Sequence, residues 1–144
     1  MKFKRVLALA LFSAALPVFA DKKIIQPKEF AAGGPLSPAI LVDGTLYVSG
    51  QLGRDLKTQK VPQDFEAEVR QVLDSIGIIL REAKMNYGDV VSVQIYLTDM
   101  GLFQRMNGVY TTYFKSDRPS RTTVGVVKLA APDAHIEITV TARR

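Results

Sequence analysis

The sequence predicts an α+β domain in which two helices pack on one face of a mixed β-sheet. Two segments repeat apolar residues at the three-and-four spacing of an amphipathic helix, and the remaining ordered segments have the composition or alternation of strands. The order is strand-strand-helix-strand-helix-strand-strand. Two helices that each need an apolar partner fit one side of a single sheet. The other face of the sheet is then left uncovered, which makes it a candidate subunit interface.

A β-hairpin is predicted near the start of the domain. Residues 39–42 and 45–49 are rich in strand-forming side chains, and Asp43-Gly44 between them is a strong signal for a two-residue turn. Residues 22–26 can supply one more short strand. Residues 50–62 are polar and are interrupted by glycine and proline, so we expect a surface loop there.

The first helix is predicted to start at Phe65 and to run to about Ala83. Asp64 is the expected N-cap, and Glu66 and Glu68 lie favourably near the positive end of the helix. Asn86-Tyr87-Gly88 is expected to stop it. The apolar stripe of this helix is interpreted as core.

The second half of the chain repeats the alternation of strand and helix. Residues 91–97 alternate as a strand with one buried face, and residues 102–114 repeat at helical spacing, with Asp99 as the expected cap. The aromatic stripe of this helix is interpreted as packing. Residues 122–129 and 135–142 are two further predicted strands.

The first twenty residues have the features of a secretory signal peptide. Three cationic residues precede an uncharged run over residues 6–16, which is too short to cross a bilayer, and the segment ends at Ala20. We expect cleavage after Ala20, a single mature domain over residues 21–144, and a periplasmic or secreted location. A retained signal anchor is the alternative, but a polar chain follows at once and no second apolar stretch is present.

The mature segment is nearly neutral and has no cysteine. Residues 1–20 hold three of the 19 Lys+Arg and none of the 14 Asp+Glu, so 16 cations remain against 14 anions, a formal charge of +2. This charge argues against nucleic acid or a membrane surface as a partner. Without cysteine, and with His135 as the single histidine, thiol chemistry and zinc sites built on Cys or His clusters are excluded. We expect neither a metal nor a cofactor.

Polar residues at the edges of strands are the remaining candidates for chemistry. Arg121 begins an otherwise uncharged strand, where an inward guanidinium needs an anionic partner such as a substrate carboxylate. Glu137 alternates with Ile136 and Ile138 and so faces the opposite side, where partial burial would raise its pKa and suit it to acid-base catalysis. On composition alone, a surface Arg121, a solvent-facing Glu137 and a surface His135 are the commoner outcomes. The candidates are Ser49, Asn107, Arg118, Arg121, Thr123 and Glu137.

Six short motifs follow one another along the mature chain. They are GPLSPA (34–39), LYVSGQ (46–51), the strand of residues 91–100 ending in LTDM, MNGVY (106–110), PSR (119–121) and IEI (136–138). Together they resemble the Rid (reactive intermediate deaminase, YjgF-like) family from about Ile25 to the C-terminus. Each motif alone is weak, but six in the right order are hard to obtain by coincidence.

The resemblance implies a chorismate-mutase-like fold of the bacillus type, a homotrimeric barrel with a cleft between neighbouring subunits. It implies metal-free hydrolysis of 2-imino or 2-enamino acids to 2-keto acids and ammonia. Arg121 would bind the substrate carboxylate, and Glu137 would position or activate water. Such a reaction needs orientation and a proton shuttle, without metal or covalent nucleophile. Matching positions that would line or support the pocket are Gly50, Thr123, Asn107, Ser49 and Leu36.

Three positions depart from the family pattern. Leu36 stands where the best-studied deaminases carry Tyr, Pro38 replaces Gln, and Thr123 replaces a residue that is often Cys. Loss of the tyrosine hydroxyl is expected to change the substrate size preference or to lower the rate. Leu36 and export favour an alternative, a non-catalytic trimeric protein that binds small carboxylate metabolites, whereas Arg121 together with Glu137 favours catalysis. A nuclease, an activity also attributed to the family, is disfavoured by the mature charge.

Overall fold

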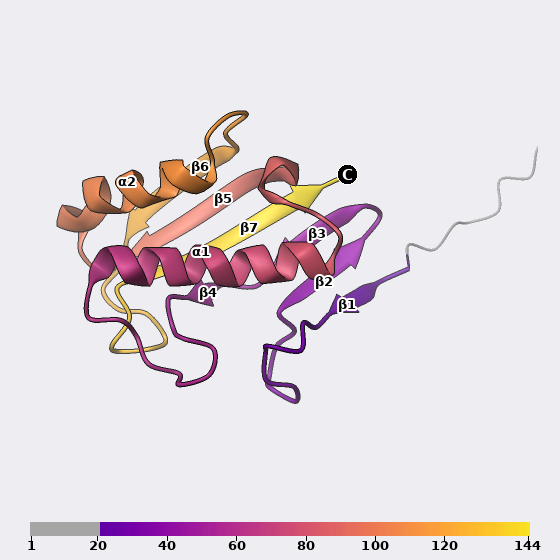
Figure 1. Cartoon of the computed structure of the whole chain (residues 1–144), viewed down its shortest axis with the longest axis horizontal. Coiled ribbons are helices and arrows are strands. Elements are labelled where there is room, and N and C mark those ends of the chain that lie inside the picture. The colour runs from indigo at the N-terminus through magenta and orange to yellow at the C-terminus, as the bar shows by residue number, and fades with distance from the viewer. Residues whose placement is uncertain (1–20) are drawn as a thin grey trace, which may run out of the picture.

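A seven-stranded sheet backed by two helices makes up residues 21–144, the part of the chain that the computed structural model describes (Figure 1). The strand order is β1-β2-β3-β7-β5-β6, and the short β4 pairs with β7. Strands β5 and β6 are parallel, and every other pair is antiparallel. The predicted α+β class is confirmed. The predicted signal peptide, residues 1–20, lies outside the described residues.

The elements follow the predicted order. They are β1 (Lys23–Ile25), β2 (Ala39–Val42), β3 (Thr45–Val48), β4 (Gln51–Leu52), α1 (Phe65–Glu82), the 3-10 turn η1 (Tyr87–Asp89), β5 (Val90–Leu97), the 3-10 turn η2 (Met100–Leu102), α2 (Phe103–Tyr113), β6 (Ser120–Gly125) and β7 (Ile136–Arg143). Neither α1 nor α2 is long and apolar enough to span a bilayer.

The predicted hairpin of β2 and β3 is confirmed. Asp43 and Gly44 have φ of 49° and 70°, the positive values that a two-residue type I′ turn requires. Strand β1 adds to β2, as expected for residues 22–26. The loop predicted over residues 50–62 was wrong at Gln51–Leu52, which forms β4. Strand β7 extends beyond β3, and β4 pairs with the part that β3 does not reach.

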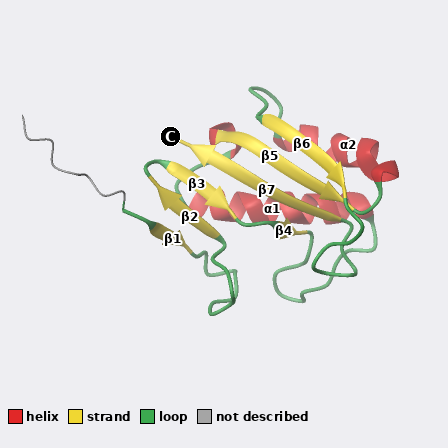
Figure 2. Ribbon diagram, turned by 180° about the vertical axis from the view of Figure 1, so that it is seen from behind, coloured by secondary structure: helices red, strands yellow, loops and turns green. Residues whose placement is uncertain are grey.

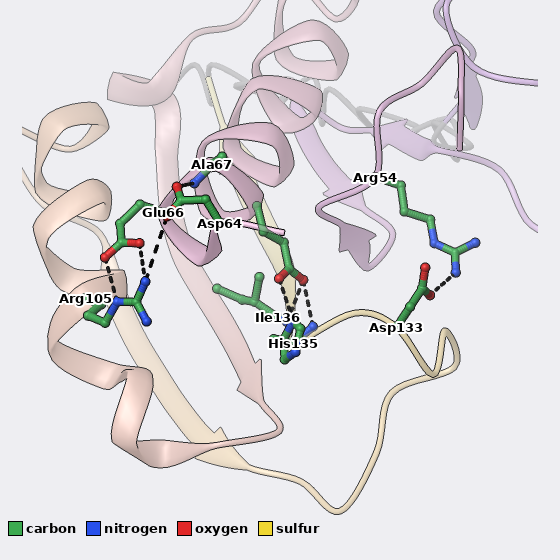
Figure 3. A network of polar contacts seen from close by, with 9 residues as sticks. Arg54, Asp64, Glu66, Ala67, Arg105, Asp133, His135 and Ile136 are labelled. Atoms are coloured by element: carbon green, nitrogen blue, oxygen red, sulfur yellow. Dashed lines mark hydrogen bonds and ion pairs between the residues drawn. The ribbon is translucent and has the colours of Figure 1, made fainter. Parts of the chain in front are cut away.

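Helix α1 begins where the sequence places it. Asp64 Oδ2 accepts a hydrogen bond from the Ala67 backbone N–H at 2.8 Å (Figure 3). The helix ends at Glu82, with Ala83 as its C-cap, which confirms the predicted end at about Ala83. Lys84 adopts a φ of 59° and turns the chain before the expected stop at residues 86–88. Asn86 instead caps the 3-10 turn η1.

The cap predicted for the second helix is displaced by one short turn. Asp99 accepts from the Gly101 backbone N–H at 2.7 Å and so caps η2, while α2 starts at Phe103 with no side-chain cap. A 3-10 turn before a helix leaves the same sequence signal as the helix itself, since both need an acceptor for their first free N–H groups.

The strand predicted over residues 122–129 was too long. Strand β6 ends at Gly125, after which the Val126 N–H donates to the Leu97 carbonyl at 2.8 Å. Leu129 leaves the sheet and packs with Ala131 and Ala134 in a small apolar cluster of the β6–β7 loop. An apolar run does not distinguish a strand from a loop that has its own core.

The two faces of the sheet differ as predicted. Side chains of β5 and β7 that face the helices are buried, among them Val93, Ile95, Ile136 and Ile138. Within residues 21–144, no helix covers the other face (Figure 2). That face is mixed rather than apolar. It carries the exposed side chains of Ile24, Tyr47 and Val124 beside the polar residues Ser92, Gln94, Thr139 and Thr141.

A buried carboxylate ties α1 to the start of β7. Glu68 is fully buried, and its Oε1 accepts from the backbone N–H groups of His135 at 2.7 Å and Ile136 at 3.3 Å (Figure 3). Its Oε2 lies 2.9 Å from His135 Nδ1. A Cβ on Gly53 would lie 2.4 Å from Glu68 Cγ, so the glycine makes room for this side chain. The contact fixes the chain immediately before Glu137.

Glu68→Ala should lower the free energy of unfolding by about 2–4 kcal/mol, because two backbone N–H groups lose their acceptor in the interior. Glu68→Gln should lose less, since the amide oxygen can still accept. Urea denaturation followed by circular dichroism measures both. Glu82→Ala, an exposed change on the same helix, should leave the curve nearly unchanged. Equal losses for Glu68→Ala and Glu82→Ala would show that the buried contact is not stabilising.

Candidate functional site

Glu137 lies on the uncovered face of the sheet, against Gly50. Ile136 and Ile138 on either side of it are buried beneath the helices, so Glu137 points the other way, as predicted. A Cβ on Gly50 would lie 1.9 Å from Glu137 Oε1. Glycine at this position is therefore what leaves space for the carboxylate. Burial raises the pKa of the Glu137 carboxyl, and no charge or hydrogen bond within residues 21–144 opposes that shift.

Gly50 also lines a cavity of about 330 Å³ between the loop before β2 and the loop after β4. Leu36 forms part of its wall and is 64% exposed, so the cavity is open at that side. Ser49 holds the Leu36 loop in place. Its Oγ donates to the Ser37 carbonyl at 2.7 Å, and its backbone N–H donates to the Pro38 carbonyl at 3.0 Å.

Arg121 lies on the other face, which the helices cover. Its register partner on β5 is Val93, whose side chain is buried there. The Arg121 Cζ lies 4.6 Å from the centroid of the Tyr110 ring and 5.7 Å from that of Phe103. A guanidinium over an aromatic ring is attracted by the negative face of the ring. The inward orientation considered for Arg121 is present, and within the described residues its partners are aromatic rather than anionic.

A second cavity, of about 350 Å³, adjoins Arg121 between α2 and the start of β6. The side chains that line it include Asn107, Tyr110, Arg118 and Arg121. The Tyr110 hydroxyl is buried and has no hydrogen-bond partner among the described residues. Burial raises the pKa of this hydroxyl, while the positive charges of Arg121 and Arg118 oppose the shift. The Thr123 hydroxyl is likewise buried without a partner in this part of the chain.

Arg121 and Glu137 do not meet in one chain. On β5, Arg121 is paired with Val93 and Glu137 with Tyr96. These two positions are three apart along the strand, and an odd spacing places side chains on opposite faces. The predicted residues thus fall into two groups. Leu36, Ser49, Gly50 and Glu137 form one half-site on the uncovered side, and Asn107, Arg121 and Thr123 form another at the helix side. A site that contains both charged groups needs two copies of the chain.

Tyr110 was missed as a site residue. The helical period assigned it to packing, and its ring is indeed part of the core. Tyr110 nevertheless also lines the Arg121 cavity. Helical periodicity predicts which face of a helix is buried, but it does not predict what the end of a long side chain contacts. Among residues 21–144, no group of three or more His, Asp or Glu side chains is placed to hold a metal ion.

The chain resembles known proteins in both sequence and structure. Residues 26–144 match the family model described as Endoribonuclease L-PSP. A 2-iminobutanoate/2-iminopropanoate deaminase of Bos taurus is 43% identical over 110 residues, 75% of this chain and 80% of that protein. A solved structure of the Rid-family protein YyfA from Yersinia pestis has a TM-score of 0.81 at 35% identity, covering 86% and 100% of the two chains. E. coli TdcF with bound serine has a TM-score of 0.80 at 28% identity, covering 85% and 98%.

Glu137→Gln should become increasingly more stable than the wild type as the pH rises. Burial raises the pKa of Glu137 in the folded chain above its unfolded value. Its contribution to stability is therefore complete below the unfolded pKa and is lost as the pH rises through the folded pKa. Glutamine does not titrate, so the difference in Tm should be small near pH about 3.5 and grow toward pH about 7. Scanning calorimetry across this range, with Glu82→Gln as the exposed control, measures it; a difference independent of pH contradicts the expectation.

Proposed function

The chain belongs to the Endoribonuclease L-PSP (Rid) family, and from this premise we propose that it hydrolyses 2-imino and 2-enamino acids to 2-keto acids and ammonia in clefts between the subunits of a homotrimer. The observation that carries the proposal is the division of Arg121 and Glu137 between two half-sites on opposite faces of one sheet. Relatives named 2-iminobutanoate/2-iminopropanoate deaminase support the reaction class.

Arg121 is suited to bind the carboxylate of such a substrate. Its Cζ lies 4.6 Å from the centroid of the Tyr110 ring, and no carboxylate of residues 21–144 lies within 4.0 Å of its nitrogens, so its N–H groups are available for a ligand. A carboxylate can accept two parallel hydrogen bonds from this edge. The substrate would thereby gain a fixed orientation, which is a large part of what this hydrolysis needs.

Glu137 of a neighbouring copy would supply the proton transfers. It takes a proton from water as the water oxygen forms a bond to the iminium carbon, and the electron pair of the C=N double bond moves to nitrogen. The same proton then passes from Glu137 to nitrogen, and the C–N bond breaks with its electron pair leaving on ammonia. The remaining hydroxyl group gives its proton to Glu137, which passes it to water, and the ketone is formed. One water is consumed and one ammonia is released. A carboxyl whose pKa is raised by burial is a better base in the first step.

The uncovered sheet face supports assembly of several copies. Ile24, Tyr47 and Val124 expose between 41% and 56% of their surface there, and neither α1 nor α2 covers them. We place the trimer contact on this face, with the edges of neighbouring sheets bringing Glu137 of one copy near the Arg121 cavity of another. We also propose that the protein acts after export, because residues 1–20 have the pattern of a signal peptide. Mass spectrometry of the exported protein tests this, since the mature chain should begin at Asp21.

Purified residues 21–144 should accelerate the loss of 2-imino acids that an amino-acid oxidase generates in the assay. Arg121→Ala should lower kcat/KM by roughly 10- to 100-fold, since a charge-assisted hydrogen bond to the carboxylate is lost. Glu137→Gln should lower kcat by roughly 100-fold or more, the usual effect of removing a general base. Arg81→Ala, which removes an exposed cation from the last turn of α1, is the matched control and should keep wild-type rates.

A different outcome would identify a binding protein. The deaminase proposal is wrong if the wild type leaves imines at the buffer rate while calorimetry shows that it binds 2-keto acids and that Arg121→Ala does not. Arg121 would then hold a carboxylate ligand without turnover, and Glu137 would have another role.

A further inference from the structure

Arg118 places a second guanidinium in the cavity that Arg121 lines. The cavity of about 350 Å³ is bounded by Asn107, Tyr110, Thr111, Arg118, Pro119 and Arg121. Arg118 lies in the turn before β6, and Arg121 is the second residue of that strand. Both positive charges are close enough to Tyr110 to lower the pKa of its hydroxyl, against the effect of burial. The cavity therefore concentrates two cations around one buried donor.

Arg118 is held in this position by the end of α2. Its Nε–H donates to the Phe114 carbonyl at 3.1 Å, one of the last carbonyls of the helix, where a positive charge is favoured. This bond uses one N–H of the guanidinium and leaves the terminal nitrogens for a ligand. The hydrogen bond restrains the position of this exposed side chain.

Neither arginine has an anionic partner within the described residues. Arg54, Arg70 and Arg105 each lie within 4.0 Å of a carboxylate, whereas no such ion pair is formed there by Arg118 or Arg121. The Tyr110 hydroxyl, on a side chain that is 3% exposed, also lacks an acceptor. Like charges in one cavity repel each other, and a buried donor without an acceptor is costly. Arg118 is exposed and Arg121 is partly buried, and one carboxylate pairs with one arginine, so a ligand with two carboxylates can engage both.

We propose that this cavity binds both carboxylates of a 2-imino dicarboxylic acid, the class of compound formed when aspartate or glutamate is oxidised to its imine. Arg121 holds the carboxylate beside the imine carbon, and Arg118 holds the carboxylate of the side chain. This assignment rests on the proposed deaminase function and specifies its substrate class. Arg118 acts as a specificity-determining residue, because substrates with an apolar side chain give it nothing to bind.

The test compares two imine substrates across three variants. The dicarboxylic imine is generated by a D-aspartate oxidase from D-aspartate, and the monocarboxylic imine by a D-amino-acid oxidase from D-alanine. Arg118→Ala should lower kcat/KM for the dicarboxylic imine by roughly 10-fold and leave the monocarboxylic value within about 2-fold. The loss should appear in KM rather than kcat, because the side-chain carboxylate is bound alike in ground and transition states. Arg118→Lys should recover part of kcat/KM for the dicarboxylic imine, since lysine keeps the positive charge but cannot form two parallel hydrogen bonds.

Lys115→Ala is the matched control, because it removes an exposed cation from the same connection without touching the cavity. Lys115→Ala should leave kcat/KM unchanged for both substrates. Equal losses on both imines in Arg118→Ala would mean that Arg118 helps to hold the shared carboxylate, and no loss on either would mean that it binds no substrate group. Each of these results overturns the proposal.

A binding measurement separates failure of this assignment from failure of the proposed function. If no imine is hydrolysed, the deaminase proposal fails, and calorimetry with succinate and butyrate still tests the cavity. Tighter binding of succinate, lost in Arg118→Ala, supports the dicarboxylate site. Absence of this preference overturns it. If succinate binds through Arg118 while turnover of the dicarboxylic imine does not depend on Arg118, the cavity serves a separate dicarboxylate ligand and the substrate assignment is wrong.

Discussion

The alternation of side chains along β-strands is the constraint on which the candidate site depends. In this sheet it directs Arg121 toward the helices and Glu137 toward the uncovered face, with β5 between the strands that carry them. No side-chain rotation brings a group through a sheet. A reaction that uses both groups therefore requires the uncovered face of one copy to approach the edge of another copy. For such a reaction, assembly is necessary.

Each half-site holds a charged group by contacts that belong to the core. On one side, Gly50 leaves the space that the Glu137 carboxylate occupies, and Glu68 fixes the start of β7 just before it. On the other side, the Tyr110 ring packs against the Arg121 guanidinium. Neither charged group has an ionic partner within the described residues. Such arrangements cost stability in the free protein and are compensated when a ligand of opposite charge is bound.

The sequence predicted those features that have a local cause. Amphipathic spacing and turn residues located both helices and the hairpin, and period-two alternation oriented Glu137. Glu68 and β4 could not be predicted, because the partners of both lie on a strand far along the chain and no local pattern marks them. The separation of Arg121 from Glu137 was hidden for a related reason. Alternation shows which residues of one strand share a face. Whether residues on two different strands share a face depends on the register of the strands, which is set by the whole sheet.

Mixing Arg121→Ala and Glu137→Gln subunits tests directly whether the two half-sites come from different copies. Each variant alone lacks one group in every site, whereas a mixed ring contains clefts in which both groups are intact. After joint unfolding and refolding, random assortment predicts recovery of roughly a quarter of the wild-type imine hydrolysis. If native mass spectrometry shows mixed oligomers and their activity does not exceed that of the separately refolded variants, Arg121 and Glu137 do not form a site between subunits.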